Sequence, residues 1–162
     1  MEIQMSKTDL IQLLKDYKEN KAKLNIRLKE LKNCRIKLKN LETETNLTTS
    51  YGINQDIHSK NKISNKVLDK VEQKDTKKSE LEEEIKELEK TIRELREKVE
   101  VIDDSLEGLR YKERELLHAY YIEGRTYEDI GNNLYFQLFS QTRDKHTIKK
   151  IIDKATQKMI SL

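Results

Sequence analysis

The residues best suited to bind another molecule lie near the C-terminus, where positive charge is concentrated. Residues 143–162 contain six Lys and Arg residues against two acidic ones, although the 162-residue chain carries a net charge of only +3. Lysine and arginine neutralise phosphate charge, and histidine and threonine add hydrogen-bonding groups, so this composition is typical of a polyanion-binding surface. The candidate binding residues are Arg143, Lys145, His146, Thr147, Lys149, Lys150 and Lys154.

An amphipathic helix is predicted to carry these side chains. Ile148, Ile151 or Ile152, Ala155 and Met159 recur at intervals of three and four residues, which places them on one helix face. Asp144 is a favourable N-cap residue, so the helix is expected to begin directly after it. The basic side chains then lie mostly on the opposite face. This basic face could bind a ligand, or it could be a solvated surface without one. The pattern of the residues before the helix distinguishes these two interpretations.

Two further helices are predicted before this basic helix. The first begins near residue 109 and ends at Gly124, because glycine readily adopts the left-handed backbone that closes a helix. The second extends from Tyr127 to about Leu134, with Thr126 as its N-cap. Two short helices, of which the later one is basic and polar at its N-terminal end, are typical of a helix-turn-helix that places the later helix in the major groove of DNA. We therefore expect double-stranded DNA as the ligand.

The rest of the chain is predicted to form long helices, so the fold class is all-α. Apolar residues recur at alternating intervals of three and four from Leu10 to Leu38, where Lys21 and Arg35 interrupt the pattern. They recur again from Val67 to Leu109, and every such position from Leu81 onward is apolar. The predicted organisation is an N-terminal heptad helix (1–47), a polar connector (48–63), a coiled-coil helix (64–108) and a small C-terminal helix-turn-helix domain (109–162). The second heptad run is expected to form an oligomerisation seam that consists of Leu81, Ile85, Leu88, Ile92, Leu95, Val99 and Ile102.

Two pairings of the heptad helices are compatible with this pattern. The two runs can fold back on each other across the connector as an antiparallel hairpin, or the second run can pair with the same segment of another chain. Both pairings together give a four-helix assembly. Ile or Val at one seam position with Leu at the other favours a parallel dimer. A homodimer is therefore expected, and the pairing within or between chains remains open.

Two segments of the chain resemble a known family. Residues 114–131 (RELLHAYYIEGRTYEDIG) and 146–155 (HTIKKIIDKA) are similar to the helix-turn-helix of region 4 in sigma-70-type factors, and more closely to the ArpU/RinA-like phage transcriptional regulators. The resemblance implies a regulator of phage or prophage genes in the cytoplasm of a bacterial host, with RNA polymerase as a further partner. It also implies that Asp144 takes the cap position, and that the DNA-facing positions are Lys145, His146, Thr147, Lys149 and Lys150.

One segment departs from the pattern of that family. Residues 135–143 (YFQLFSQTR) stand where the family has a very short turn between the two helices. Because Phe136, Leu138 and Phe139 are apolar, the insertion is expected to pack against the domain or to extend a helix. The angle between the two helices remains open at this stage.

Patterns for other chemistries are missing from the sequence. The three histidines are scattered without metal-ligand spacing, and Cys34 is the only cysteine, which excludes an internal disulfide. The chain has neither a glycine-rich phosphate loop nor a nucleophile motif. We expect no enzymatic activity, no metal and no cofactor.

No run of residues approaches the ~20 apolar residues that span a bilayer, so the sequence predicts no membrane association.

Two alternatives to a transcriptional regulator remain. One is a coiled-coil protein-interaction module, and the other is a DNA-packaging subunit similar to a phage small terminase.

Overall fold

A computed structural model describes the backbone of residues 5–51 and 65–162. Its side chains are described over residues 5–44 and 68–162. Every regular element in this part of the chain is helical, which confirms the predicted all-α class.

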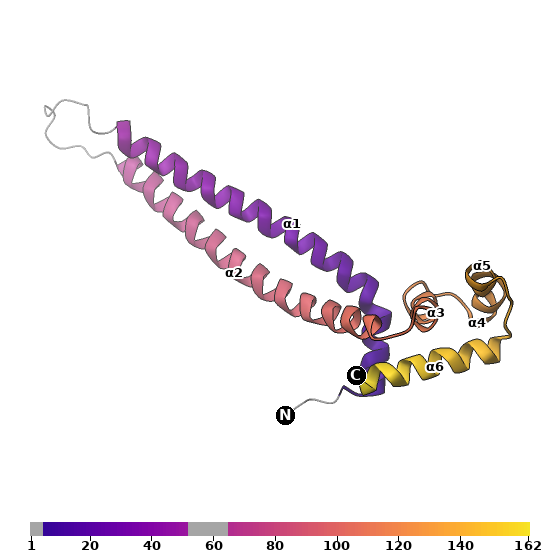
Figure 1. Ribbon diagram of the computed structural model, residues 1–162. Helices are drawn as coiled ribbons and strands as arrows, with labels where there is room; N and C mark the ends of the chain where they lie inside the picture. Colours follow the sequence, from indigo (N-terminus) through magenta and orange to yellow (C-terminus); the bar gives the residue numbers. More distant parts are fainter. Residues whose placement is uncertain (1–4, 52–64) are drawn as a thin grey trace, which may run out of the picture. The chain divides into compact units, whose positions relative to one another are not determined.

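Two long helices precede a group of shorter ones (Figure 1). Helix α1 spans Lys7–Tyr51 and helix α2 spans Asn65–Glu107. The absence of proline from the chain permits this length, because proline would break the backbone hydrogen-bond ladder. The predicted connector starts too early, since α1 continues through residues 48–51. The remainder of that connector, 52–63, lies outside the described residues.

The chain divides into two compact units. The first combines Met1–Lys23 with Leu95–Leu162, and the second is Leu24–Glu94. Each unit contains a stretch of α1 beside a stretch of α2 (Figure 1).

The second unit pairs α1 and α2 in antiparallel directions. Arg35 lies 2.8 Å from the carboxylate of Glu89, and Glu42 lies 3.5 Å from the ammonium group of Lys78. Positions later in α1 thus meet positions earlier in α2. Of the two pairings that the heptads leave open, the structure shows the one within the chain.

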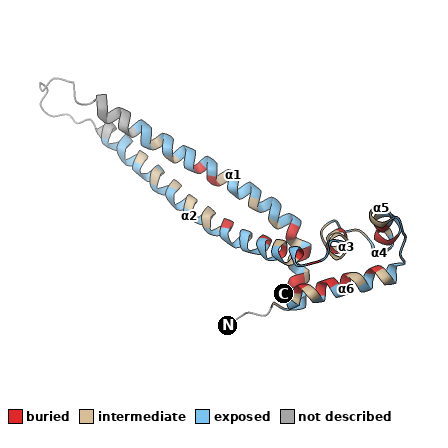
Figure 2. Ribbon diagram, viewed as in Figure 1, coloured by how far each residue is buried: buried red, intermediate tan, exposed pale blue. Residues whose placement is uncertain are grey.

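The seam of α2 is buried to different depths along the helix (Figure 2). In the second unit Ile92 is 4% exposed, whereas Leu81, Ile85 and Leu88 are half-buried. In the first unit Ile102 is fully buried and Val99 is nearly so.

A polar network accompanies the apolar seam in the first unit. The Tyr17 hydroxyl donates a hydrogen bond to Asp103 of α2. Lys21, which interrupts the heptad pattern of α1, donates to the same hydroxyl oxygen at 3.0 Å. Lys21 is itself exposed to solvent, so its charge stays hydrated at this seam position while its ammonium group bonds to Tyr17.

Three helical segments follow α2. Helix α3 spans Tyr111–Tyr121, and the last helix, α6, spans Lys145–Ser161. Between them a continuous helical stretch comprises α4 (Tyr127–Asp129), a π-helical turn η1 (Ile130–Leu134) and α5 (Tyr135–Phe139).

The predicted end of the second helix near Leu134 is wrong. The helix continues to Phe139 and stops at Ser140, which has the left-handed φ of 55°. Tyr135 explains the continuation, because it is 2% exposed and belongs to the core of the C-terminal helices. The insertion therefore extends the second helix, which is one of the two outcomes expected from the sequence. Only a short turn joins this helix to α6.

One apolar core unites these segments. Each contributes buried residues, so the three pack as a single body within the first unit. The core consists of Leu116, Ala119, Ile130, Tyr135, Ile148 and Ile152.

Candidate nucleic-acid interface

Helix α6 has one buried face and one basic face. Ile148, Ile152 and Ala155 are fully buried, and Met159 is nearly so. Ile151 is only half-buried, so Ile152 takes the inward position of the two that the spacing allowed. The opposite face is exposed to solvent. The exposed basic side chains of α6 are Lys145, His146, Lys149, Lys150 and Lys154.

Asp144 closes the N-terminal end of α6. Its carboxylate accepts hydrogen bonds from the amide of His146 at 3.1 Å and from the amide of Thr147 at 3.2 Å. The Thr147 hydroxyl donates to the same carboxylate at 2.5 Å. The bonds from the hydroxyl and the amide of Thr147, together with the amide of His146, hold the pKa of Asp144 below its ordinary value. The structure places Asp144 where an N-cap lies, with its side chain on the first free amides of the helix.

This cap limits what Thr147 can offer to a ligand. Its hydroxyl hydrogen is already donated to Asp144, and the residue is half-buried. Of the predicted binding residues, Thr147 therefore has a structural role at the helix end, and only its oxygen lone pairs remain for a base or a phosphate. The carboxylate of Asp144 also occupies the amides that would otherwise attract an anion.

The turn before α6 lies close to the second helix. The amide of Arg143 donates to the carbonyl oxygen of Gly131 at 3.0 Å. A β-carbon at Gly131 would collide with the carbonyl oxygen of Arg143, so only glycine fits this approach. The side chain of Arg143 is exposed and donates to Gln141 at 3.2 Å. The orientation of α6 thus depends on a backbone contact between the turn and η1.

The corner between α3 and the second helix is built from Gly124 and a capped helix start. Gly124 has a φ of 72°, as expected of a residue that ends a helix. The Thr126 hydroxyl accepts a hydrogen bond from the amide of Asp129 at 3.2 Å, which is N-cap geometry. The Asp129 carboxylate accepts from Arg125 and from Asn133. The Arg125 bond is the main reason that the pKa of Asp129 is lowered.

Three tyrosines fill the space behind this corner. The rings of Tyr120 and Tyr127 stack with centroids 4.2 Å apart, and Tyr121 meets Tyr120 edge-on at 4.8 Å. Burial raises the pKa of Tyr127, and the neighbouring Tyr120 raises it further. These contacts join α3 to the start of the second helix.

An ion pair ties α3 to the distal part of α6. The ammonium group of Lys158 lies 3.2 Å from the carboxylate of Glu113, which also accepts from the amide of Arg110 at 3.0 Å. Burial acts to raise the pKa of Glu113, but these two hydrogen bonds outweigh it and the pKa is lowered. This ion pair adds to the apolar contacts that hold α6 against α3.

Lys112 belongs to this region although sequence reasoning did not select it. Its ammonium group lies 4.9 Å from the ring centroid of Tyr135 and 5.6 Å from that of Phe139. The guanidinium of Arg143 lies 5.7 Å from the Tyr135 ring. Lys112 and Arg143 are far apart in sequence, and no periodicity connects them. Packing of α3 against the second helix brings them together.

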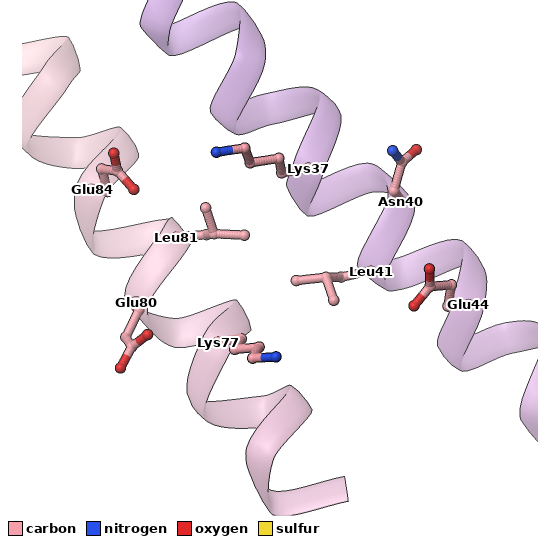
Figure 3. A pocket seen from close by; sticks show the side chains of 8 residues that line it. All are labelled: Lys37, Asn40, Leu41, Glu44, Lys77, Glu80, Leu81 and Glu84. Carbon is pink, nitrogen blue, oxygen red and sulfur yellow. The ribbon is translucent and has the colours of Figure 1, made fainter. Parts of the chain in front are cut away.

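The second unit contains a groove of about 390 Å³ between α1 and α2. In it Leu81 and Leu41 point toward one another from the two helices (Figure 3). Leu81 is one of the residues predicted to form an oligomerisation seam. The structure directs it to a helix of its own chain.

Comparison with family models, with curated proteins and with solved structures finds no match. None of the helices in the described part of the chain has the length and apolar character needed to cross a membrane. Over the same residues, no three His, Cys, Asp or Glu side chains are gathered in a way that would hold a metal ion.

Proposed function

We propose that this chain is a sequence-specific DNA-binding transcriptional regulator in which α6 enters the major groove. The observation that carries the proposal is the exposed basic face of α6, presented at a capped helix start on a three-segment helical core. This is the arrangement in which a helix-turn-helix presents its later helix to DNA. The resemblance to ArpU/RinA-like regulators extends the proposal to phage or prophage genes, a bacterial cytoplasm and contact with RNA polymerase.

Phosphate contacts would supply most of the affinity. Arg143, Lys145, Lys149, Lys150 and Lys154 are all exposed cations, and each one that neutralises a phosphate releases condensed counterions. His146 is exposed beside them in the first turn of α6, where side chains of a recognition helix reach base edges. Affinity is therefore expected to fall steeply as the salt concentration rises.

A homodimer is part of the same proposal. Two linked helix-turn-helix units bind paired half-sites with far higher avidity than one unit binds a single half-site. The half-buried seam positions Ile85 and Leu88 leave apolar surface in the second unit that a second copy would cover.

The experiment is a binding titration on upstream DNA from the genome that encodes the chain. It compares the wild type with Lys149→Ala/Lys150→Ala, at several salt concentrations. If both lysines contact phosphate, the slope of log affinity against log salt falls by about 1.8, since each phosphate contact contributes ~0.9. The matched control is Lys86→Ala/Lys90→Ala on α2, which removes the same charge from exposed positions. Equal slopes for the wild type and the α6 variant contradict the role of α6.

A coiled-coil protein-interaction module is the second candidate. The half-buried seam of the second unit favours it, because the same apolar surface suits a partner protein as well as a second copy. This function predicts no salt-dependent DNA affinity, and deletion of residues 24–94 would abolish binding of the partner. The titration above distinguishes the two candidates directly.

A further inference from the structure

Two cations meet at one buried tyrosine beside the turn that precedes α6. Tyr135 is 2% exposed, while Lys112 from α3 and Arg143 from the turn reach its ring from 4.9 Å and 5.7 Å. Burial acts to raise the pKa of Tyr135, but the positive charges of Lys112 and Arg143 beside its hydroxyl outweigh burial, and the pKa is lowered. Both cations are therefore directed to the same ring and hydroxyl.

In the part of the chain that the structure describes, no carboxylate forms an ion pair with either Lys112 or Arg143. The acids next to them in the sequence are engaged elsewhere, since Asp144 caps α6 and Glu113 pairs with Lys158. Both cations lie beside the same ring without a counter-charge of their own, so an anion bound there would be attracted by both.

We propose that Lys112 and Arg143 form a clamp for one phosphate group of the DNA backbone, with Tyr135 as the residue that positions both cations. The inference rests on the proposed DNA-binding function and adds to it a contact from α3. Arg143 supplies a planar fork of donors and Lys112 a compact charge, which together suit a phosphate oxygen cluster. Arg143 directly precedes the cap of α6, so the clamp lies at the helix end that would enter the groove. A contact of this kind fixes the register of α6 on the duplex and carries no sequence information.

The deciding experiment measures affinity for a random-sequence duplex over a range of salt concentrations. Lys112→Ala is expected to lower the slope of log affinity against log salt by about 0.9, the contribution of one phosphate. Because the clamp holds its phosphate only with both cations in place, Lys112→Ala/Arg143→Ala should lower the slope by no more than the single change does. Lys112→Arg retains the charge and should retain the slope, and Lys90→Ala on α2 is the control for loss of a remote positive charge. An unchanged slope in Lys112→Ala, or a double variant that loses twice as much, overturns the clamp.

Two further measurements separate the clamp from the wider proposal. Circular dichroism melting of Lys112→Ala against the wild type establishes that the variant is folded. If the wild type shows no DNA affinity, the proposed function fails, and inorganic phosphate then tests the clamp by NMR. Saturable shifts of the Gly131 and Arg143 amides in the wild type that are lost in Lys112→Ala support an anion site. Their absence from the wild type overturns it.

Discussion

Replacing Gly131 by alanine tests whether the backbone contact between η1 and the turn sets the position of α6. A β-carbon at this position would approach the carbonyl oxygen of Arg143 more closely than the 3.0 Å limit of real contacts, and it would lie 3.3 Å from the side chain of Ile148. The atom in the way is backbone, so no side-chain rotation relieves the clash. The turn must move away from the helix, and it would carry the start of α6 with it.

The expected cost follows from three effects of different sign. Overpacking at a closely packed site costs ~1–3 kcal/mol. Loss of the hydrogen bond from the Arg143 amide to Gly131 costs about 0.5–1.5 kcal/mol more. Alanine in a helix gains roughly 0.8–1.0 kcal/mol over glycine. The clash and the lost bond outweigh the gain, so the free energy of unfolding should fall by about 1–3 kcal/mol.

Urea unfolding followed by circular dichroism measures this change, and a DNA titration measures its consequence for α6. Gly124→Ala is the matched control, because a β-carbon there meets no atom within 4 Å and only the φ of 72° opposes it. It should cost roughly 1–2 kcal/mol through backbone strain, and it should leave the turn before α6 in place. A Gly131→Ala variant as stable as the wild type, with undiminished DNA affinity, would refute the close contact as the device that orients α6.

Three other predictions concern charged groups. Asp144→Ala should lower the melting temperature of the C-terminal helices near neutral pH. Because the pKa of Asp144 is lowered in the fold, the stability that its carboxylate contributes is complete above the ordinary value of 3.8 and disappears as the pH falls below that value. Melting curves of the wild type and the variant should therefore converge in acid. Glu113→Gln should lower the free energy of unfolding by roughly 0.2–1 kcal/mol through the partly exposed Lys158 pair, and an unchanged urea midpoint would contradict it. Arg35→Glu and Glu89→Arg should each lower the free energy of unfolding of the second unit. The variant that carries both changes should recover part of this stability, and a double-mutant cycle should give a coupling energy of about 0.2–1 kcal/mol.

Local chemistry made several parts of the C-terminal fold predictable. Gly124 takes a positive φ three residues beyond the end of α3, and Thr126 and Asp144 accept hydrogen bonds at the starts of the next two helices. Each of these features depends on a few adjacent residues, which is the range over which sequence patterns are informative. The inward stripe of α6 follows from spacing for the same reason, apart from the choice between Ile151 and Ile152.

Features that depend on tertiary packing were not predictable in this way. The second helix passes Leu134 because Tyr135 is buried among residues of α3 and α6, and that burial is invisible in the local pattern. Lys112 was not predicted as a binding residue for the same reason, since the rings that it contacts, Tyr135 and Phe139, lie on another helix. Gly131 is the last residue of the segment 114–131 that resembles the family. The reason that only glycine fits at this position follows from the close approach of the Arg143 carbonyl oxygen, which the sequence does not reveal.

The pairing of the long helices was left open by the apolar seam, yet charge distinguishes the alternatives. Residues 27–39 contain six basic residues and one acidic residue, whereas residues 80–89 contain six acidic residues and one basic residue. A parallel dimer of α2 would place the acidic run beside its own copy, where like charges repel. Antiparallel pairing within the chain places it beside the basic run instead, and the ion pair between Arg35 and Glu89 is one such contact. A parallel zipper of α2 alone would give up this charge complementarity, which is why the intrachain pairing is favoured over it.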